Sequence, residues 1–145
     1  MTSITVEATY PVTPEVVWEE LRHLERHVDW MHDAVRIDFL TDQHDGVGTE
    51  FHCDTRVGPF RTRDLMTITE WAENAVMGVT HSGVVTGEGR FTLTGVGTST
   101  TLTWRERLHF PWWLGSPIGA LVASPVLRAL WMRNLHQLGG RFTSS

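Results

Sequence analysis

The chain has 145 residues and a net charge of −5, with 41% hydrophobic and 20% charged residues. This length suits one domain with a sizeable core, and the negative charge excludes strong attraction to nucleic acid or anionic lipid. The chain contains no lysine, which excludes Schiff-base chemistry, pyridoxal phosphate attachment and a Walker lysine.

The N-terminal part predicts one strand followed by two short helices. Residues 4–10 alternate as in a strand. Thr13 is a candidate N-cap and Pro14 suits the first position of the following helix. Residues 27–33 predict a second short helix or turn. The first ten residues lack the basic start and apolar run of a signal peptide, so we expect a cytoplasmic location.

From Val35 onward the hydrophobic period changes to two residues, which predicts six further strands. Segments rich in Gly, Asp, Asn and Pro separate them, and these short links imply antiparallel neighbours. The six predicted strands cover residues 35–40, 48–57, 60–71, 75–81, 87–94 and 100–110.

The segment between His109 and Arg128 holds eighteen residues without a charge, which is the length of a membrane span. Three prolines and two glycines interrupt it, so we favour a loop that leads into a buried helix. The apolar residues at its start suit a lid over one end of a cavity. These residues are Phe110, Trp112, Trp113 and Leu114.

A long C-terminal helix is predicted from Pro117 to the pair Gly139–Gly140, which we expect to end it. Pro125 lies inside the helix and should kink it. A kinked helix over a concave sheet leaves a cavity. Residues on one stripe of this helix are expected to face the sheet, namely Leu127, Trp131, Asn134 and Leu138.

Several segments together resemble the START-like helix-grip superfamily, in its polyketide cyclase/dehydrase and lipid-transport branch, often labelled SRPBCC. They are "VTPEVVWEELRHLERHVDWM", "GVGTEF", "TITEW", "GRFTLTGVGTSTTLTW" and "LRALWMRNLHQL", in that order. The resemblance implies that residues 1–145 form a single START-like ligand-binding domain of the α+β class. Its fold would be a seven-stranded antiparallel sheet wrapped around a long C-terminal helix, with two short helices after the first strand.

The resemblance leaves the ligand and the chemistry open, because function depends on the site and not on the fold. Members of this superfamily bind sterols, lipids or quinones, and some close or dehydrate aromatic polyketide rings. Others serve as hormone receptors or act on ribosomes or chaperones.

Strand alternation predicts which side chains face the helix. Glu106 shares a face with apolar residues of the last strand, and Asp64 and His81 fall on the inner face of their own strands. A buried carboxylate needs a partner, so these groups are either structural or functional. As functional groups, they would anchor a ligand or serve as acid and base in enolisation, aldol closure or dehydration.

The other predicted cavity residues are mostly apolar, and the same pattern also suits a packed core. Gly87 and Gly89 lie on this inner face and would leave space there. The predicted ligand-binding residues are Trp30, Phe51, Cys53, Met66, Met77, Val79, Phe91, Trp104, Leu108, Trp113, Leu127, Trp131 and Asn134.

No metal site or cofactor is predicted. His23 and His27 are four residues apart, close to Asp29 and His32, but we interpret them as a solvated helix face. Cys53 is the only cysteine, which excludes an internal disulfide and a CxxC site, and we interpret it as a buried small residue. The glycine-containing motifs are turns without a nucleotide-binding context.

Three hypotheses for function follow. The first is a protein that binds a small hydrophobic or aromatic ligand, such as a lipid, polyketide or quinone, in an internal cavity. The second is a polyketide-type cyclase or dehydratase that uses Glu106, Asp64 and His81. The third is a protein-interaction module with a vestigial cavity and a Trp112–Trp113 contact surface. We expect no nucleic-acid partner and no stable insertion into a membrane, and the oligomeric state stays open.

Overall fold

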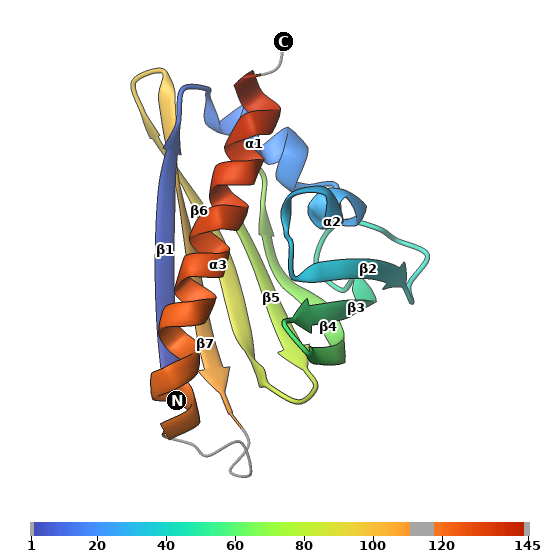
Figure 1. The fold of residues 1–145 in the computed structure, drawn as a ribbon. Helices are drawn as coiled ribbons and strands as arrows, with labels where there is room; N and C mark the ends of the chain where they lie inside the picture. The colour runs from blue at the N-terminus through green and yellow to red at the C-terminus, as the bar shows by residue number, and fades with distance from the viewer. Residues whose placement is uncertain (1, 111–117, 144–145) are drawn as a thin grey trace.

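The computed structural model of the protein describes residues 2–110 and 118–143. One antiparallel sheet of seven strands forms the body, and a long helix crosses one of its faces (Figure 1). The elements are β1 (Thr2–Tyr10), α1 (Pro14–Leu21), the 3₁₀ helix η1 (Leu24–Arg26), α2 (His27–Trp30), β2 (Ala34–Phe39), β3 (Glu50–Val57), β4 (Phe60–Ala72), β5 (Val76–Ser82), β6 (Thr86–Val96), β7 (Ser99–His109) and α3 (Ile118–Thr143).

The strand order is β1-β7-β6-β5-β4-β3-β2, so the first and last strands pair. Strands β1 and β2 lie at opposite edges, and α1, η1 and α2 connect them. Every predicted strand is present, and the predicted fold class is confirmed. The structure is a helix-grip α+β fold in which α3 covers the inner face of a curved sheet (Figure 1).

Helix α3 packs along the sheet through the predicted apolar stripe. Trp131, Leu135 and Leu138 are buried with Asn134, and Leu127 is half-buried. The burial of these large side chains is the main contribution of the helix to stability, because apolar area removed from water stabilises the folded state.

The C-terminal end of α3 differs from the prediction, since Gly139 and Gly140 do not end the helix and it continues to Thr143. The residues after the glycines have partners: the Phe142 ring packs on the Tyr10 ring with centroids 5.1 Å apart, and Arg141 pairs with Glu20 of α1. Gly139 itself lies close to β1. A Cβ atom at Gly139 would lie 3.0 Å from the ring of Tyr10, and the Tyr10 hydroxyl donates a hydrogen bond to the Leu135 carbonyl oxygen at 2.7 Å. The glycine lets the helix pack against this ring.

A bulge in β4 changes the face on which its side chains lie. The pairing of β4 with β5 shifts between Ile68 and Glu70. Beyond this point Trp71 packs against Trp18 of α1, with ring centroids 5.1 Å apart, while Glu70 forms an ion pair with Arg90 at 3.0 Å. The bulge therefore ends the cavity-facing part of β4 at Ile68 and directs Trp71 into the core under α1.

Within the described ranges, no helix is long and apolar enough to cross a membrane. The predicted lid residues Trp112, Trp113 and Leu114 lie outside the described residues. Phe110, the first of the predicted lid, is half-buried and lines the cavity described below.

Candidate functional site: an apolar cavity lined by three carboxylates

A cavity of about 740 Å³ lies between the inner face of the sheet and α3. Its wall is mainly apolar, and this volume falls within the usual size of small-molecule sites. Ten of the predicted ligand-binding residues line it, namely Phe51, Cys53, Met66, Met77, Val79, Phe91, Trp104, Leu108, Leu127 and Trp131.

The three predicted polar groups also reach the cavity, and the structure brings two of them together. Nε2 of His81 lies 3.1 Å from Oε2 of Glu106, and Trp104 donates a hydrogen bond from Nε1 to Oε1 of Glu106 at 2.9 Å. Glu106 is only 8% exposed. Both carboxylate oxygens have a protein partner, and these hydrogen bonds compensate for the cost of burying the charge.

A glycine makes room for this pair of side chains. His81 is on β5 and Glu106 is on β7, with β6 between them. Gly89 of β6 lies directly opposite Glu106, and a Cβ atom at Gly89 would lie 2.3 Å from Oε1 of Glu106. The predicted space at this glycine exists, and the Glu106 carboxylate occupies part of it.

The surroundings of His81 favour its protonated form. Burial by itself lowers the pKa of this imidazole, but the hydrogen bond and charge of Glu106 outweigh burial and raise it above the ordinary value. Nδ1 of His81 also faces an acceptor, the Val85 carbonyl oxygen at 3.3 Å. Because both ring nitrogens face acceptors, the imidazolium satisfies both contacts.

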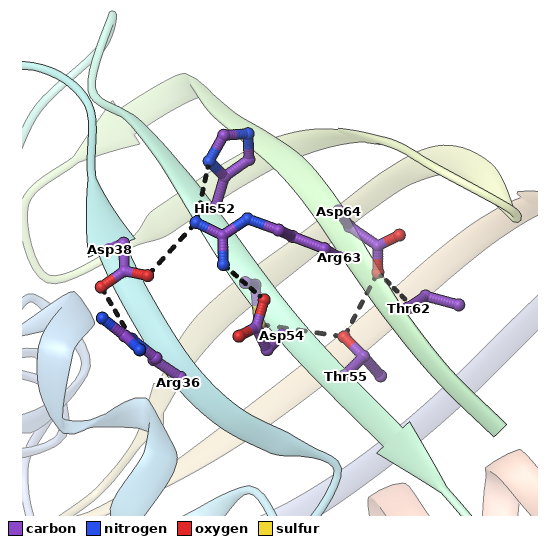
Figure 2. Close-up of polar contacts among 9 residues, drawn as sticks. Arg36, Asp38, His52, Asp54, Thr55, Thr62, Arg63 and Asp64 are labelled. Carbon is purple, nitrogen blue, oxygen red and sulfur yellow. Dashed lines mark hydrogen bonds and ion pairs between the residues drawn. The ribbon is translucent and has the colours of Figure 1, made fainter. Parts of the chain in front are cut away.

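Asp64 occupies a separate part of the cavity wall. Its Oδ2 accepts hydrogen bonds from the hydroxyls of Thr55 at 3.2 Å and Thr62 at 3.1 Å. Figure 2 shows Asp64 turned toward these two threonines. Thr55 and Thr62 also line the cavity. Neither threonine was predicted as a site residue, although strand alternation places Thr62 on the same face as Asp64.

The neighbouring arginine points away from Asp64, as the alternation predicts. Arg63 forms an ion pair with Asp54 at 2.9 Å and with Asp38 at 3.3 Å, and it donates to Nδ1 of His52 at 3.3 Å (Figure 2). Arg63 thus belongs to a charged network on the outer face of β2, β3 and β4, and among the described residues Asp64 has no arginine partner.

A third carboxylate, Asp33, lines the cavity and was not predicted as a site residue. It accepts hydrogen bonds from Nδ2 of Asn134 at 2.7 Å and from Nε1 of Trp131 at 3.3 Å, both on α3. Oδ1 of Asn134 accepts a hydrogen bond from the His32 amide at 3.0 Å. Burial raises the pKa of Asp33 despite these hydrogen bonds.

Two predicted ligand-binding residues do not line the cavity. Asn134 is fully buried and binds Asp33 instead of facing the open space. Trp30 lies behind the wall, where its ring packs against Phe91 and Trp104 with centroids 6.1 and 6.5 Å apart. Trp113, the remaining predicted residue, lies outside the described residues.

Cys53 and His27 are both buried, with carboxylates nearby. Burial raises the pKa of Cys53 to about 11, so its thiol is a poor nucleophile at neutral pH. The interpretation of His27 as part of a solvated helix face is wrong, because α1 ends at Leu21 and His27 is buried on α2. Its Nε2 donates to the Leu21 carbonyl oxygen at 2.8 Å, and burial lowers its pKa. His23 lies at the surface and binds Glu19.

Solved structures confirm the fold. The Thermus thermophilus protein TTHA0849 has a TM-score of 0.83 and 16% identity, covering 99% of this chain and 100% of its own. A conserved protein from Geobacillus kaustophilus has a TM-score of 0.81 and 14% identity, covering 97% and 94%. A START superfamily protein from Mycobacterium smegmatis has a TM-score of 0.71 and 15% identity, covering 95% and 92%.

The family relationship rests on a sequence match. No curated protein sequence matches the chain. The family model described as polyketide cyclase/dehydrase and lipid transport matches residues 1–142, nearly the whole chain. The chain therefore belongs to the polyketide cyclase/dehydrase and lipid-transport family.

Proposed function

We propose that this protein binds one small hydrophobic or aromatic molecule in the cavity between the sheet and α3. The observation that carries the proposal is the cavity itself, with about 740 Å³ of space behind a mainly apolar wall. An empty apolar space of this size costs stability, since its lining atoms lack packing partners. An apolar ligand would supply those contacts.

The aromatic wall supports a flat ligand. Trp104 and Trp131 stack with ring centroids 5.1 Å apart and planes at 26°, and Phe91 lies 5.1 Å from Trp104. Such rings give a ligand large contact area with little loss of conformational entropy.

Binding of the neutral apolar dye Nile red tests the proposal. We expect saturable binding at one molecule per chain with micromolar affinity, roughly −8 kcal/mol. Val79 lines the cavity on β5, whereas the next residue, Thr80, is exposed on the outer face. Val79→Trp should fill the cavity and abolish binding, and the matched variant Thr80→Trp should bind as the wild type does. Equal dye binding by both variants would place the dye outside the cavity.

A second candidate function is acid–base catalysis, as in a cyclase or dehydratase, and the contact between His81 and Glu106 favours it. In this arrangement the His81 imidazolium would give up its longer contact, with the Val85 carbonyl oxygen, and donate that proton to a substrate oxygen, and the Glu106 carboxylate would accept one from carbon. Asp64 has no hydrogen bond to either group and would act only as a polar anchor.

The two candidates separate in a model reaction, the exchange of deuterium into the acidic C–H of 2-tetralone, a bicyclic ketone. A catalytic pair predicts that the wild type accelerates the exchange and that Glu106→Gln and His81→Gln lose the acceleration while Nile red binding survives. A carrier predicts no acceleration by the wild type. The third hypothesis, a vestigial cavity, requires a filled core, and the open volume argues against it.

A further inference from the structure

The polar groups of the cavity wall include more hydrogen-bond acceptors than free donors. Three carboxylates line it, from Asp33, Asp64 and Glu106. They come from different elements: Asp33 precedes β2, Asp64 is on β4 and Glu106 is on β7. The excess of acceptors is thus spread along the cavity wall.

Among the described residues, the side-chain donors beside these three carboxylates already have acceptors. Trp104 and His81 donate to Glu106, Trp131 and Asn134 donate to Asp33, and two threonine hydroxyls donate to Asp64. The other ring nitrogen of His81 faces the Val85 carbonyl oxygen. These contacts leave the carboxylates with unused lone pairs, because an ionised carboxylate has about four acceptor positions.

The arginines in the cavity wall do not reverse this balance. Arg90 is exposed and paired with Glu70 on the outer face. Arg61 is exposed and precedes Thr62 on β4, so the strand alternation directs its side chain away from Asp64. A carboxylate ligand deep in the cavity would therefore meet like charges and few free donors.

Resting on the proposed ligand binding, we infer that the cavity selects aromatic molecules with hydrogen-bond-donating hydroxyl or amino groups and rejects those that carry a carboxylate. The aromatic rings would hold the flat part of the ligand, and the spare lone pairs of the carboxylates would accept its O–H or N–H groups. An ammonium group would gain further from the negative charge of the wall. Fatty acids carry a carboxylate, so we expect the cavity to reject them.

Competition against bound Nile red tests this selectivity with four ligands that share one ring system: naphthalene, 2-naphthol, 2-naphthylmethylamine and 2-naphthoate. We expect 2-naphthol and 2-naphthylmethylamine to displace the dye at concentrations at least 10-fold lower than those required of 2-naphthoate. Both should also displace it at lower concentrations than naphthalene does. 2-Naphthol is a neutral donor and 2-naphthylmethylamine a cationic one. Comparing the concentrations at which they displace the dye shows whether a positive charge strengthens binding beyond the hydrogen bond.

Isosteric variants assign the preference to the wall. We expect a smaller ratio between the dye-displacing concentrations of 2-naphthoate and 2-naphthol in each of three variants, Glu106→Gln, Asp33→Asn and Asp64→Asn. Asp54→Asn removes the same charge from the outer face, where Asp54 pairs with Arg63, and should leave the ratio unchanged. Any carboxylate variant that fails to bind Nile red is replaced by the other two in this comparison.

The outcomes distinguish the two proposals. Saturable Nile red binding with 2-naphthoate displacing as well as 2-naphthol overturns the selectivity and leaves ligand binding in place. If Asp54→Asn reduces the ratio between 2-naphthoate and 2-naphthol as much as the cavity variants do, the selectivity proposal is also overturned, because the effect would then come from net charge. Failure of the wild type to bind Nile red contradicts the proposed function, and the selectivity falls with it.

Discussion

His81 and Glu106 meet across a strand that separates them. Their side chains approach to 3.1 Å between Nε2 and Oε2 although β6 lies between β5 and β7. The contact is possible because Gly89 of β6 has no side chain. A pair of ionisable groups is thereby held inside a mainly apolar cavity, and each group changes the chemistry of the other.

Loss of the Glu106 charge should lower the pKa of His81. Glu106→Gln removes the hydrogen bond and charge that raise this pKa and leaves the burial that lowers it. We expect NMR titration of the His81 ring to show a lower pKa in the variant. Glu70→Gln, a change on the outer face, should leave the His81 titration as in the wild type. An unchanged titration in Glu106→Gln would contradict the geometry.

The same pair should make stability depend on pH. Because the folded-state pKa of His81 is raised, its contribution is fully present below the ordinary value of 6.5 and is lost as pH rises through the raised value. The difference in unfolding free energy between wild type and Glu106→Gln should therefore be larger at pH 6 than at pH 9. Urea unfolding at the two pH values measures it, and a larger difference at pH 9 would refute the sign.

Gly89→Ala should destabilise the protein and displace Glu106. Its Cβ atom would lie 2.3 Å from Oε1 of Glu106, so the carboxylate must move, and overpacking of this kind costs about 1–3 kcal/mol. We expect a lower urea midpoint and a changed His81 titration. Gly140→Ala is the control for the titration and should leave that of His81 unchanged, because nothing lies within 4 Å of a Cβ atom there. A Gly89→Ala protein as stable as the wild type would show that the carboxylate is not held at this glycine.

Adjacent glycines in α3 should respond differently to alanine. Gly140→Ala should stabilise the helix by up to about 1 kcal/mol, the difference in helix propensity. Gly139→Ala gains the same propensity but places its Cβ atom 3.0 Å from the Tyr10 ring, so its net gain should be smaller. Thermal unfolding of the two variants measures the difference. A larger gain for Gly139→Ala would mean that α3 does not approach β1 this closely.

Asn134→Ala should destabilise the protein through Asp33. The change removes the 2.7 Å hydrogen bond to a buried carboxylate, which costs about 1–3 kcal/mol. Because burial already raises the pKa of Asp33, the deficit should be larger at pH 7 than in acid, where the carboxyl is protonated. Urea unfolding at both pH values checks this, with exposed Gln137→Ala as the control. An equal loss of unfolding free energy at both pH values would show that the loss does not depend on the charge of Asp33.

Strand alternation was sufficient to place Glu106, Asp64 and His81 on the inner face, because the side-chain period of a strand is two wherever no bulge intervenes. It holds on β4 as far as Ile68, where the pairing shifts. The stripe of α3 was likewise predicted from its period, and Trp131 faces the cavity as expected.

Contacts between distant segments were not predictable in the same way. Asp33 and Asn134 are 101 residues apart, and no local pattern records that α3 passes the start of β2. The end of α3 was missed for the same reason, since two consecutive glycines are a standard helix stop and the contacts of Arg141 with Glu20 and of Phe142 with Tyr10 join segments far apart in the sequence.

The indole N–H resonances of the protein test the central claim, ligand binding in the cavity, most directly. Trp104 and Trp131 line the cavity, whereas Trp18 and Trp71 pack together outside its wall. On titration with 2-naphthol, we expect saturable shifts of the Trp104 and Trp131 signals and little change for Trp18 and Trp71. Unchanged Trp104 and Trp131 signals, or shifts confined to the other two, would contradict it.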